Sequence, residues 1–183
     1  MGTGLFLPSD YTIDEVCEME DKGVIFVKFG TSENPPERAN QGLRFPYYEH
    51  EGKIIVLESN KRNYPKGFTF FNIKMALKYL GSYGDQLIIF DFHELRRRIE
   101  NKDDFIINKS NDTYQANQLF VKKVISLGDI DAINYIVDAI SEETLLKGGS
   151  SELFLRECGF EISADLFHKR IMEEYPEIAS NLF

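Results

Sequence analysis

Asp91, His93 and Glu94 are the residues of this chain best suited to chemistry, because they place an imidazole between two carboxylates. A histidine beside carboxylates can hold a metal ion or act as an acid–base pair. Strand alternation would put Asp91 and His93 on one face, opposite Phe90 and Phe92. A polar strand end that enters solvent is the simpler interpretation and is favoured. We therefore assign no catalytic residue, no metal ligand and no cofactor from the sequence.

A second group of residues is suited to binding a protein. Residues 31–52 contain Pro35-Pro36, Gly42 and Pro46 and predict a long irregular segment, a kind of loop that is often functional. Tyrosine and arginine contribute disproportionately to binding at protein interfaces. The candidate partner-binding residues are Arg38, Arg44, Phe45, Tyr47 and Tyr48. Two interpretations of the tyrosine pair stay open, namely anchors for a partner or a lid folded back on the core.

Composition excludes several classes of function. The 183 residues are 43% hydrophobic, which is enough for a sizeable core, and the net charge of −9 argues against a nucleic-acid-binding surface. Cys17 and Cys158, the only cysteines, are too few and too far apart for a disulfide framework or a paired-cysteine zinc site. The chain has neither an apolar run of membrane-helix length nor a signal-peptide pattern at its start. We expect a cytoplasmic protein that does not bind membranes.

The elements that must position these residues follow from hydrophobic pattern and turn residues. Thr12 and Glu15 have capping-box spacing and predict a short helix, and Asn72 is expected to cap a helix over residues 73–80. Residues 93–104 fit either a short helix or an exposed turn. Strands are expected at residues 24–29, 53–58, 68–71, 87–92 and 119–125. The last of these also fits a helical face, so strand and helix both stay open there.

From Asp129 onward the pattern becomes helical, since isoleucines recur at 130, 133, 136 and 140 after a capping aspartate. The predicted fold class is therefore α+β, with a mixed, mainly antiparallel sheet and one covering helix, followed by a helical C-terminal portion. The predicted organisation is an α+β domain over residues 1–127 and a helical extension over residues 128–183, which can pack together as one domain.

Several short elements occur in a characteristic order between residues 67 and 129. They are Gly67-Phe-Thr-Phe-Phe, Leu77-Lys-Tyr-Leu, Tyr83-Gly84-Asp85, Leu87-Ile-Ile-Phe, Tyr114-Gln-Ala-Asn117, Leu119-Phe-Val and Leu127-Gly-Asp129. This order resembles a domain of unknown function found in phage proteins and before the repeats of giant-virus ankyrin-repeat proteins. The resemblance covers about a third of the chain. It implies a small α+β scaffold of viral or mobile-element origin and brings no known activity.

Three shorter resemblances involve single elements. Residues 128–137 are similar to the second helix of an ankyrin repeat, but the chain shows no repeat period. Phe26-Val-Lys-Phe-Gly30 with Arg38 looks like the second half of a GIY-YIG nuclease motif, with Phe29 where a hydroxyl would be needed. Residues 68–92 look like part of an ADP-ribosyltransferase, whose late glutamate is missing from the strand at 119–126.

Two functional hypotheses follow from these observations. The leading hypothesis is a non-enzymatic protein-interaction module, viral or phage-encoded, that acts on a host or partner protein in the host cytoplasm. The alternative is an enzyme directed at a nucleotide or nucleic acid, related to the nuclease or the transferase named above. Convergent histidine, glutamate or arginine side chains in one deep cleft would favour the enzyme, and an exposed aromatic patch in residues 31–52 would favour binding.

Overall fold

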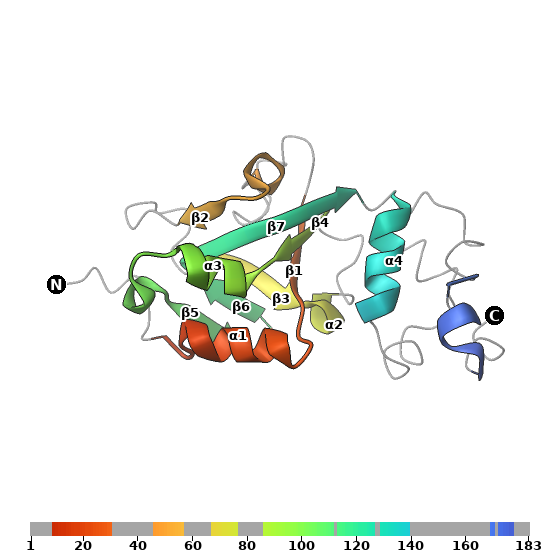
Figure 1. Ribbon diagram of the computed structural model, residues 1–183, viewed down its shortest axis with the longest axis horizontal. Helices are drawn as coiled ribbons and strands as arrows, with labels where there is room; N and C mark the ends of the chain where they lie inside the picture. Colours follow the sequence, from red (N-terminus) through yellow and green to blue (C-terminus); the bar gives the residue numbers. More distant parts are fainter. Residues whose placement is uncertain are drawn as a thin grey trace.

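A computed structural model describes residues 9–30, 46–56, 67–76, 86–111, 113–126, 129–139, 169–170 and 172–177, and the structural statements below concern these residues. The chain is an α+β protein built on a seven-stranded sheet with the order β2-β7-β4-β1-β3-β6-β5 (Figure 1). The strands are β1 (Phe26–Gly30), β2 (Ile54–Val56), β3 (Phe68–Asn72), β4 (Gln86–Phe90), β5 (Ile107–Ser110), β6 (Thr113–Ala116) and β7 (Gln118–Ser126). Every described pair of strands is antiparallel. The sequence predicted a mixed, mainly antiparallel sheet, and the described sheet contains no parallel pair.

The described helices are short and lie around this sheet. They are α1 (Ile13–Asp21), α2 (Ile73–Ala76), α3 (Phe92–Arg98) and α4 (Ile130–Ala139), with 3-10 turns η2 (Tyr47–His50) and η4 (Lys102–Asp104). Helices α1 and α3 contact each other, and α3 contacts β7 (Figure 1). Two helices therefore pack together on one face of the sheet, where the sequence predicted a single helix at residues 73–80. Residues 77–80 of that predicted helix lie outside the described residues.

Local sequence explains where the helices begin. The Thr12 hydroxyl accepts a hydrogen bond from the Glu15 backbone N–H, and the Glu15 carboxylate accepts one from the Thr12 N–H, which confirms the predicted capping box. The Asn72 side chain accepts a bond from the Met75 N–H at 2.9 Å, as predicted. Helix α4 begins at Ile130, directly after Asp129. The prediction of further helix at residues 140–168 falls outside the described residues.

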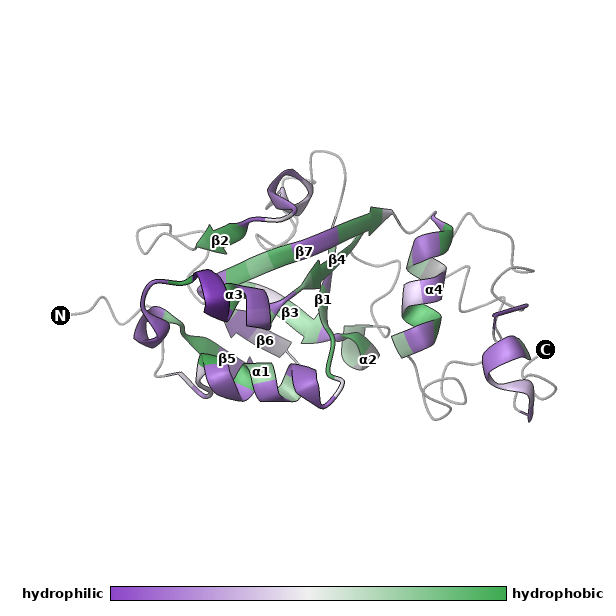
Figure 2. Cartoon of the chain, in the orientation of Figure 1, coloured by the Kyte–Doolittle hydropathy of each residue, from purple (hydrophilic) through white to green (hydrophobic). Residues whose placement is uncertain are grey.

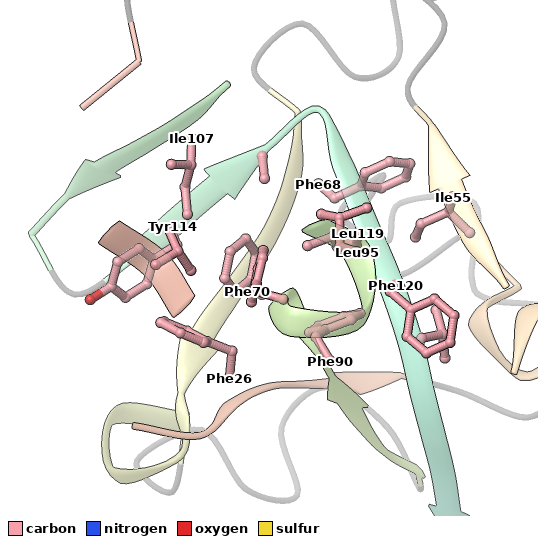
Figure 3. Close-up of a cluster of buried hydrophobic side chains, with 14 of the residues drawn as sticks. Phe26, Ile55, Phe68, Phe70, Phe90, Leu95, Ile107, Tyr114, Leu119 and Phe120 are labelled. Carbon is pink, nitrogen blue, oxygen red and sulfur yellow. The ribbon is translucent and has the colours of Figure 1, made fainter. Parts of the chain in front are cut away.

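The core between the sheet and the helix pair is aromatic. The ring centroid of Phe26 lies 5.7 Å from that of Phe70, 5.1 Å from that of Phe92 and 5.3 Å from that of Tyr114. Figure 3 shows Phe26, Phe70 and Tyr114 close together in this cluster. The apolar side of α1 faces this cluster and its polar side faces outward (Figure 2). Burial of these rings removes a large apolar area from water, which is the main favourable term in folding.

Strands β5 and β6 are not among the strands predicted from the sequence, and the predicted strand over residues 87–92 extends past the observed end of β4. Strands β5 and β6 form a hairpin in which Ser110 pairs with Thr113, leaving a two-residue turn that begins at Asn111. The strand predicted over residues 87–92 ends at Phe90, because Asp91 caps α3 by accepting a bond from the Glu94 N–H. Phe92 is therefore the first residue of a helix.

Candidate functional site

The two tyrosines of the predicted binding segment have different environments. Tyr47 is 1% exposed, with its ring centroid 6.0 Å from Phe90 and 6.4 Å from Phe68, so it belongs to the core. Tyr48 is 40% exposed. The sequence left two interpretations open. Tyr47 fits the lid that folds back on the core, whereas Tyr48 stays on the surface, where an anchor for a partner would lie. The other candidates, Arg38, Arg44 and Phe45, lie outside the described residues.

Strand β2 adds a second exposed apolar side chain to the same segment. Among the described strands it is the terminal one, and of these it pairs with β7 alone. Ile55 is buried against the core, whereas Val56 is 58% exposed. We call the outer side of β2 together with Tyr48 and Val56 the β2 edge. Gly52 and Lys53 continue this edge along β7 through backbone hydrogen bonds with Val121.

The opposite end of the sheet is covered by the chain itself. The Asp10 backbone N–H donates to the Ile107 carbonyl at 2.8 Å, and the Ile107 N–H donates to the Ser9 hydroxyl at 3.0 Å. The Lys109 N–H donates to the Asp10 carboxylate at 2.9 Å. Within the part of the chain that the structure describes, no segment binds the outer side of β2 in this way. An uncovered edge strand is a template for another strand.

The three residues first considered for chemistry do not act as one group. Asp91 caps α3, and Glu94 pairs with Arg97 and with Arg98, the latter at 2.7 Å. Hydrogen bonds from Arg97 and then Arg98 lower the pKa of Glu94 to about 2. His93 Nε2 lies 2.8 Å from Asp21 Oδ1 on α1. Each carboxylate thus has a structural role.

A different trio comes together where the end of α1 meets the start of α3. One ligand-type atom from each of Cys17, Glu20 and His93 lies within 4.8 Å of the others. Glu20 Oε1 accepts hydrogen bonds from the backbone N–H groups of Phe92 at 3.0 Å and His93 at 3.1 Å. The Cys17 thiol donates to the Phe92 carbonyl at 3.4 Å. The sequence alone suggested His93 for chemistry, set Cys17 aside as a free cysteine, and did not point to Glu20.

The electrostatics of this trio are set by burial and by neighbouring acidic groups. Burial raises the pKa of Glu20 to about 7, and the Asp91 carboxylate adds to the increase. Burial also raises the pKa of Cys17 to about 11, which favours the protonated thiol at neutral pH when no metal is bound. Tyr135 of α4 has a pKa raised to about 12 by burial and then by the charges of Glu20 and Asp91. Side chains from three helices therefore border one acidic region.

Lys28 is a buried charged residue that is not among the candidates predicted from the sequence. It is 5% exposed in the centre of the sheet, and its Nζ donates to the Thr69 carbonyl at 2.5 Å. Burial lowers its pKa to about 7. The sequence signal for this burial is a lysine within an otherwise apolar strand, Phe26-Val-Lys-Phe-Gly30. Both faces of a central strand are buried, so a lysine there is expected to be buried too.

A hollow of about 320 Å³ lies beside the start of α1, and its lining includes Asp10, Asp14, Glu15 and Lys102 but no histidine or arginine. Among the described residues, no helix is long and apolar enough to cross a membrane. Comparison of the chain with protein-family models, with curated proteins and with solved structures finds no significant match in any of the three.

Proposed function

We propose that this protein is a non-enzymatic interaction module that binds a partner protein through the β2 edge. The observation that carries the proposal is the 58% exposure of Val56 on a terminal strand, in the same segment as the exposed ring of Tyr48. The resemblance to phage and giant-virus domains supports a viral origin and a host protein as the partner.

The physical basis is strand addition. A terminal strand has backbone N–H and C=O groups on its outer side, and an extended segment of a partner can pair with them. Main-chain hydrogen bonds then supply affinity, and alternate side chains supply specificity. Val56 would contact the added strand, and Tyr48 offers a large ring that loses little rotamer freedom on binding.

The contrast between the two ends of the sheet supports this choice of edge. Ser9 and Asp10 already occupy the hydrogen-bonding positions of β5, so an added strand would have to displace them. The described part of β2 is three residues, which is too short to bind many partners by backbone pairing alone. Side-chain anchors on the same segment are therefore needed for a stable complex.

The alternative, an enzyme acting on a nucleotide or nucleic acid, has less support among the described residues. Asp91 and Glu94 are engaged in a helix cap and in ion pairs. Strand β7 carries exposed lysines at 122 and 123 where an ADP-ribosyltransferase would need a carboxylate. The hollow beside α1 has one lysine, Lys102, in a lining where carboxylates predominate, a charge balance that disfavours phosphate.

The test compares the wild-type protein with the double variant Tyr48→Ala/Val56→Ala. Tagged protein is used to isolate partners from the cells in which it is made, and the affinity of each purified partner is then measured. We expect the double variant to weaken binding at least about 30-fold, which is about 2 kcal/mol. The matched control is Ile130→Ala, which removes an exposed apolar side chain from α4 and should leave binding unchanged.

Two outcomes would contradict the proposal. One is a stoichiometric partner that binds the double variant as tightly as the wild type while circular dichroism shows both to be folded. The other is catalytic turnover of a nucleotide or nucleic acid by the wild type without any protein partner.

A further inference from the structure

We propose that Cys17, Glu20 and His93 form a binding site for a transition-metal ion of the zinc type between α1 and α3. The proposal rests on their ligand-type atoms, which lie within 4.8 Å of one another although His93 is more than 70 residues away in sequence. It concerns a different part of the molecule from the β2 edge and does not depend on the proposed function.

The two helices hold the three residues in place before any metal binds. Cys17 and Glu20 are three residues apart on α1 and therefore share a face of that helix. His93 is in the first turn of α3. The hydrogen bonds from the backbone of Phe92 and His93 to Glu20 Oε1 fix the end of α1 against the start of α3. A preorganised set of ligands reduces the entropy lost on binding.

Each of the three side chains can still offer a lone pair to a metal. Glu20 uses Oε1 for the two backbone hydrogen bonds, and no described residue donates to its Oε2. The His93 ring nitrogen Nε2 lies 2.8 Å from Asp21 Oδ1, and a histidine can bind a metal through either ring nitrogen. Metal-bound histidines commonly have such a carboxylate partner, because it fixes the ring orientation and raises ligand basicity.

The donor set selects the class of metal. One sulfur, one nitrogen and one oxygen suit zinc and its neighbours, whereas magnesium and calcium prefer oxygen ligands only. On binding, the Cys17 S–H bond is replaced by a sulfur–metal bond and the proton is released to solvent. Three protein ligands leave a fourth position for water, as in catalytic zinc sites.

Charge also favours a cation here. The carboxylates of Glu20, Asp21 and Asp91 lie around the site. Arg96 is close enough to lower the pKa of the Cys17 thiol, and its charge is paired with Asp14 at 3.2 Å. A divalent ion bound to one thiolate and one carboxylate neutralises both. The competing explanation is that Glu20 serves only as a helix cap and Cys17 only as a packing residue, which predicts no metal binding.

The experiment is a titration of the reduced full-length protein with Co²⁺, which replaces zinc and reports a bound thiolate by sulfur-to-cobalt charge-transfer absorption. We expect one equivalent to bind with this absorption and to be displaced by one equivalent of Zn²⁺. Cys17→Ser should abolish the absorption, and the matched control Cys158→Ser should retain it. Glu20→Gln and His93→Asn should each weaken Co²⁺ affinity more than about 10-fold, and Asp21→Asn about 10-fold.

The proposal is overturned if the wild type shows no saturable Co²⁺ binding, or if the charge-transfer absorption persists in Cys17→Ser. It is also overturned if His93→Asn binds Co²⁺ as tightly as the wild type. His93 is 40% exposed, so this variant keeps the fold intact and decides the question even if Cys17→Ser, which alters a buried position, does not fold.

Discussion

The Nζ atom of Lys28 lies 5.9 Å from the centre of the Tyr47 ring, so the buried lysine of the described core faces an aromatic ring where a carboxylate would be expected. Among the described residues, its polar contact is the hydrogen bond that Nζ donates to the Thr69 carbonyl. A cation held this way has lost its hydration without gaining an opposite charge.

This environment makes stability depend on pH in a defined direction. Burial lowers the pKa of folded Lys28 to about 7 from an unfolded value of 10.5, so between these values the unfolded chain binds a proton that the folded chain has lost. The free energy of unfolding contributed by Lys28 therefore rises with pH across this window, and the full cost of burying the ammonium group is present below it. We expect Lys28→Met to stabilise the protein most at low pH.

Urea unfolding at pH 6, 7.5 and 9 measures the effect. The stability advantage of Lys28→Met over wild type should decrease by about 2 to 3 kcal/mol from pH 6 to pH 9. Lys123→Met, which replaces an exposed lysine on β7, should show a difference from wild type that does not vary with pH. A constant difference for Lys28→Met would mean that Lys28 titrates normally in the folded protein.

Truncation of the adjacent tyrosines Tyr47 and Tyr48 should change the free energy of unfolding by very different amounts. Tyr47→Ala leaves a cavity among Phe68, Phe90 and Lys28 and should lower the free energy of unfolding by about 3 to 5 kcal/mol. Tyr48→Ala removes an exposed ring and should change it by less than about 0.5 kcal/mol. Denaturant unfolding of both variants checks this, and equal losses would place Tyr48 in the core as well.

Gly67 should not tolerate a side chain. It has a φ of +100°, and a Cβ there would lie 2.7 Å from the carbonyl oxygen of Ala116 on β6. Gly67→Ala should therefore cost more than about 2 kcal/mol, from backbone strain plus displacement of β6. Gly23→Ala is the matched control, because Gly23 has a similar φ of +95° but open space around it, and it should cost only about 1 kcal/mol. Thermal unfolding that ranks the two variants in reverse would contradict the close approach of β3 and β6.

The capping box of α1 should contribute measurably to stability. Thr12→Ala removes the side chain that accepts from the Glu15 N–H and should cost about 1 kcal/mol, since a helix N–H loses its partner. Glu15→Gln keeps an acceptor for the Thr12 N–H and should cost only a few tenths of that. Helix α1 carries Cys17 and Glu20, so amide hydrogen exchange in α1 should also increase in Thr12→Ala. Unchanged exchange would show that packing against α3 alone holds the helix.

The sequence predicted the long apolar strands and the capped helices because each has a local cause. Strand β4 is rich in β-forming residues, and Thr12, Asn72 and Asp129 mark helix starts by their side-chain oxygens. Strand β7, which could have been a helix, is a strand because β4 and β2 pair with it on both sides. That decision depends on tertiary pairing and has no signal in the segment itself.

The missed features have the same origin. Strands β5 and β6 are short and polar, and their turn signal is Asn111, which adopts a left-handed φ of 54° that asparagine tolerates. The cluster of Cys17, Glu20 and His93 requires knowledge that α1 packs on α3. The burial of Tyr47 beside an exposed Tyr48 likewise depends on where the core lies, which residue types alone do not specify.

The strand order has a consequence for how the chain assembles during synthesis. The described partner of β2 is β7, so some sixty residues must be made after β2 before that partner exists. The hairpin of β5 and β6, by contrast, can close locally at once. Pairings between distant segments slow folding because the intervening chain must first be ordered. If a ribosome stalls before residue 118, the nascent protein therefore lacks β7, and both β2 and β4 have an unpaired edge. Such edges are the places where nascent chains bind chaperones or each other.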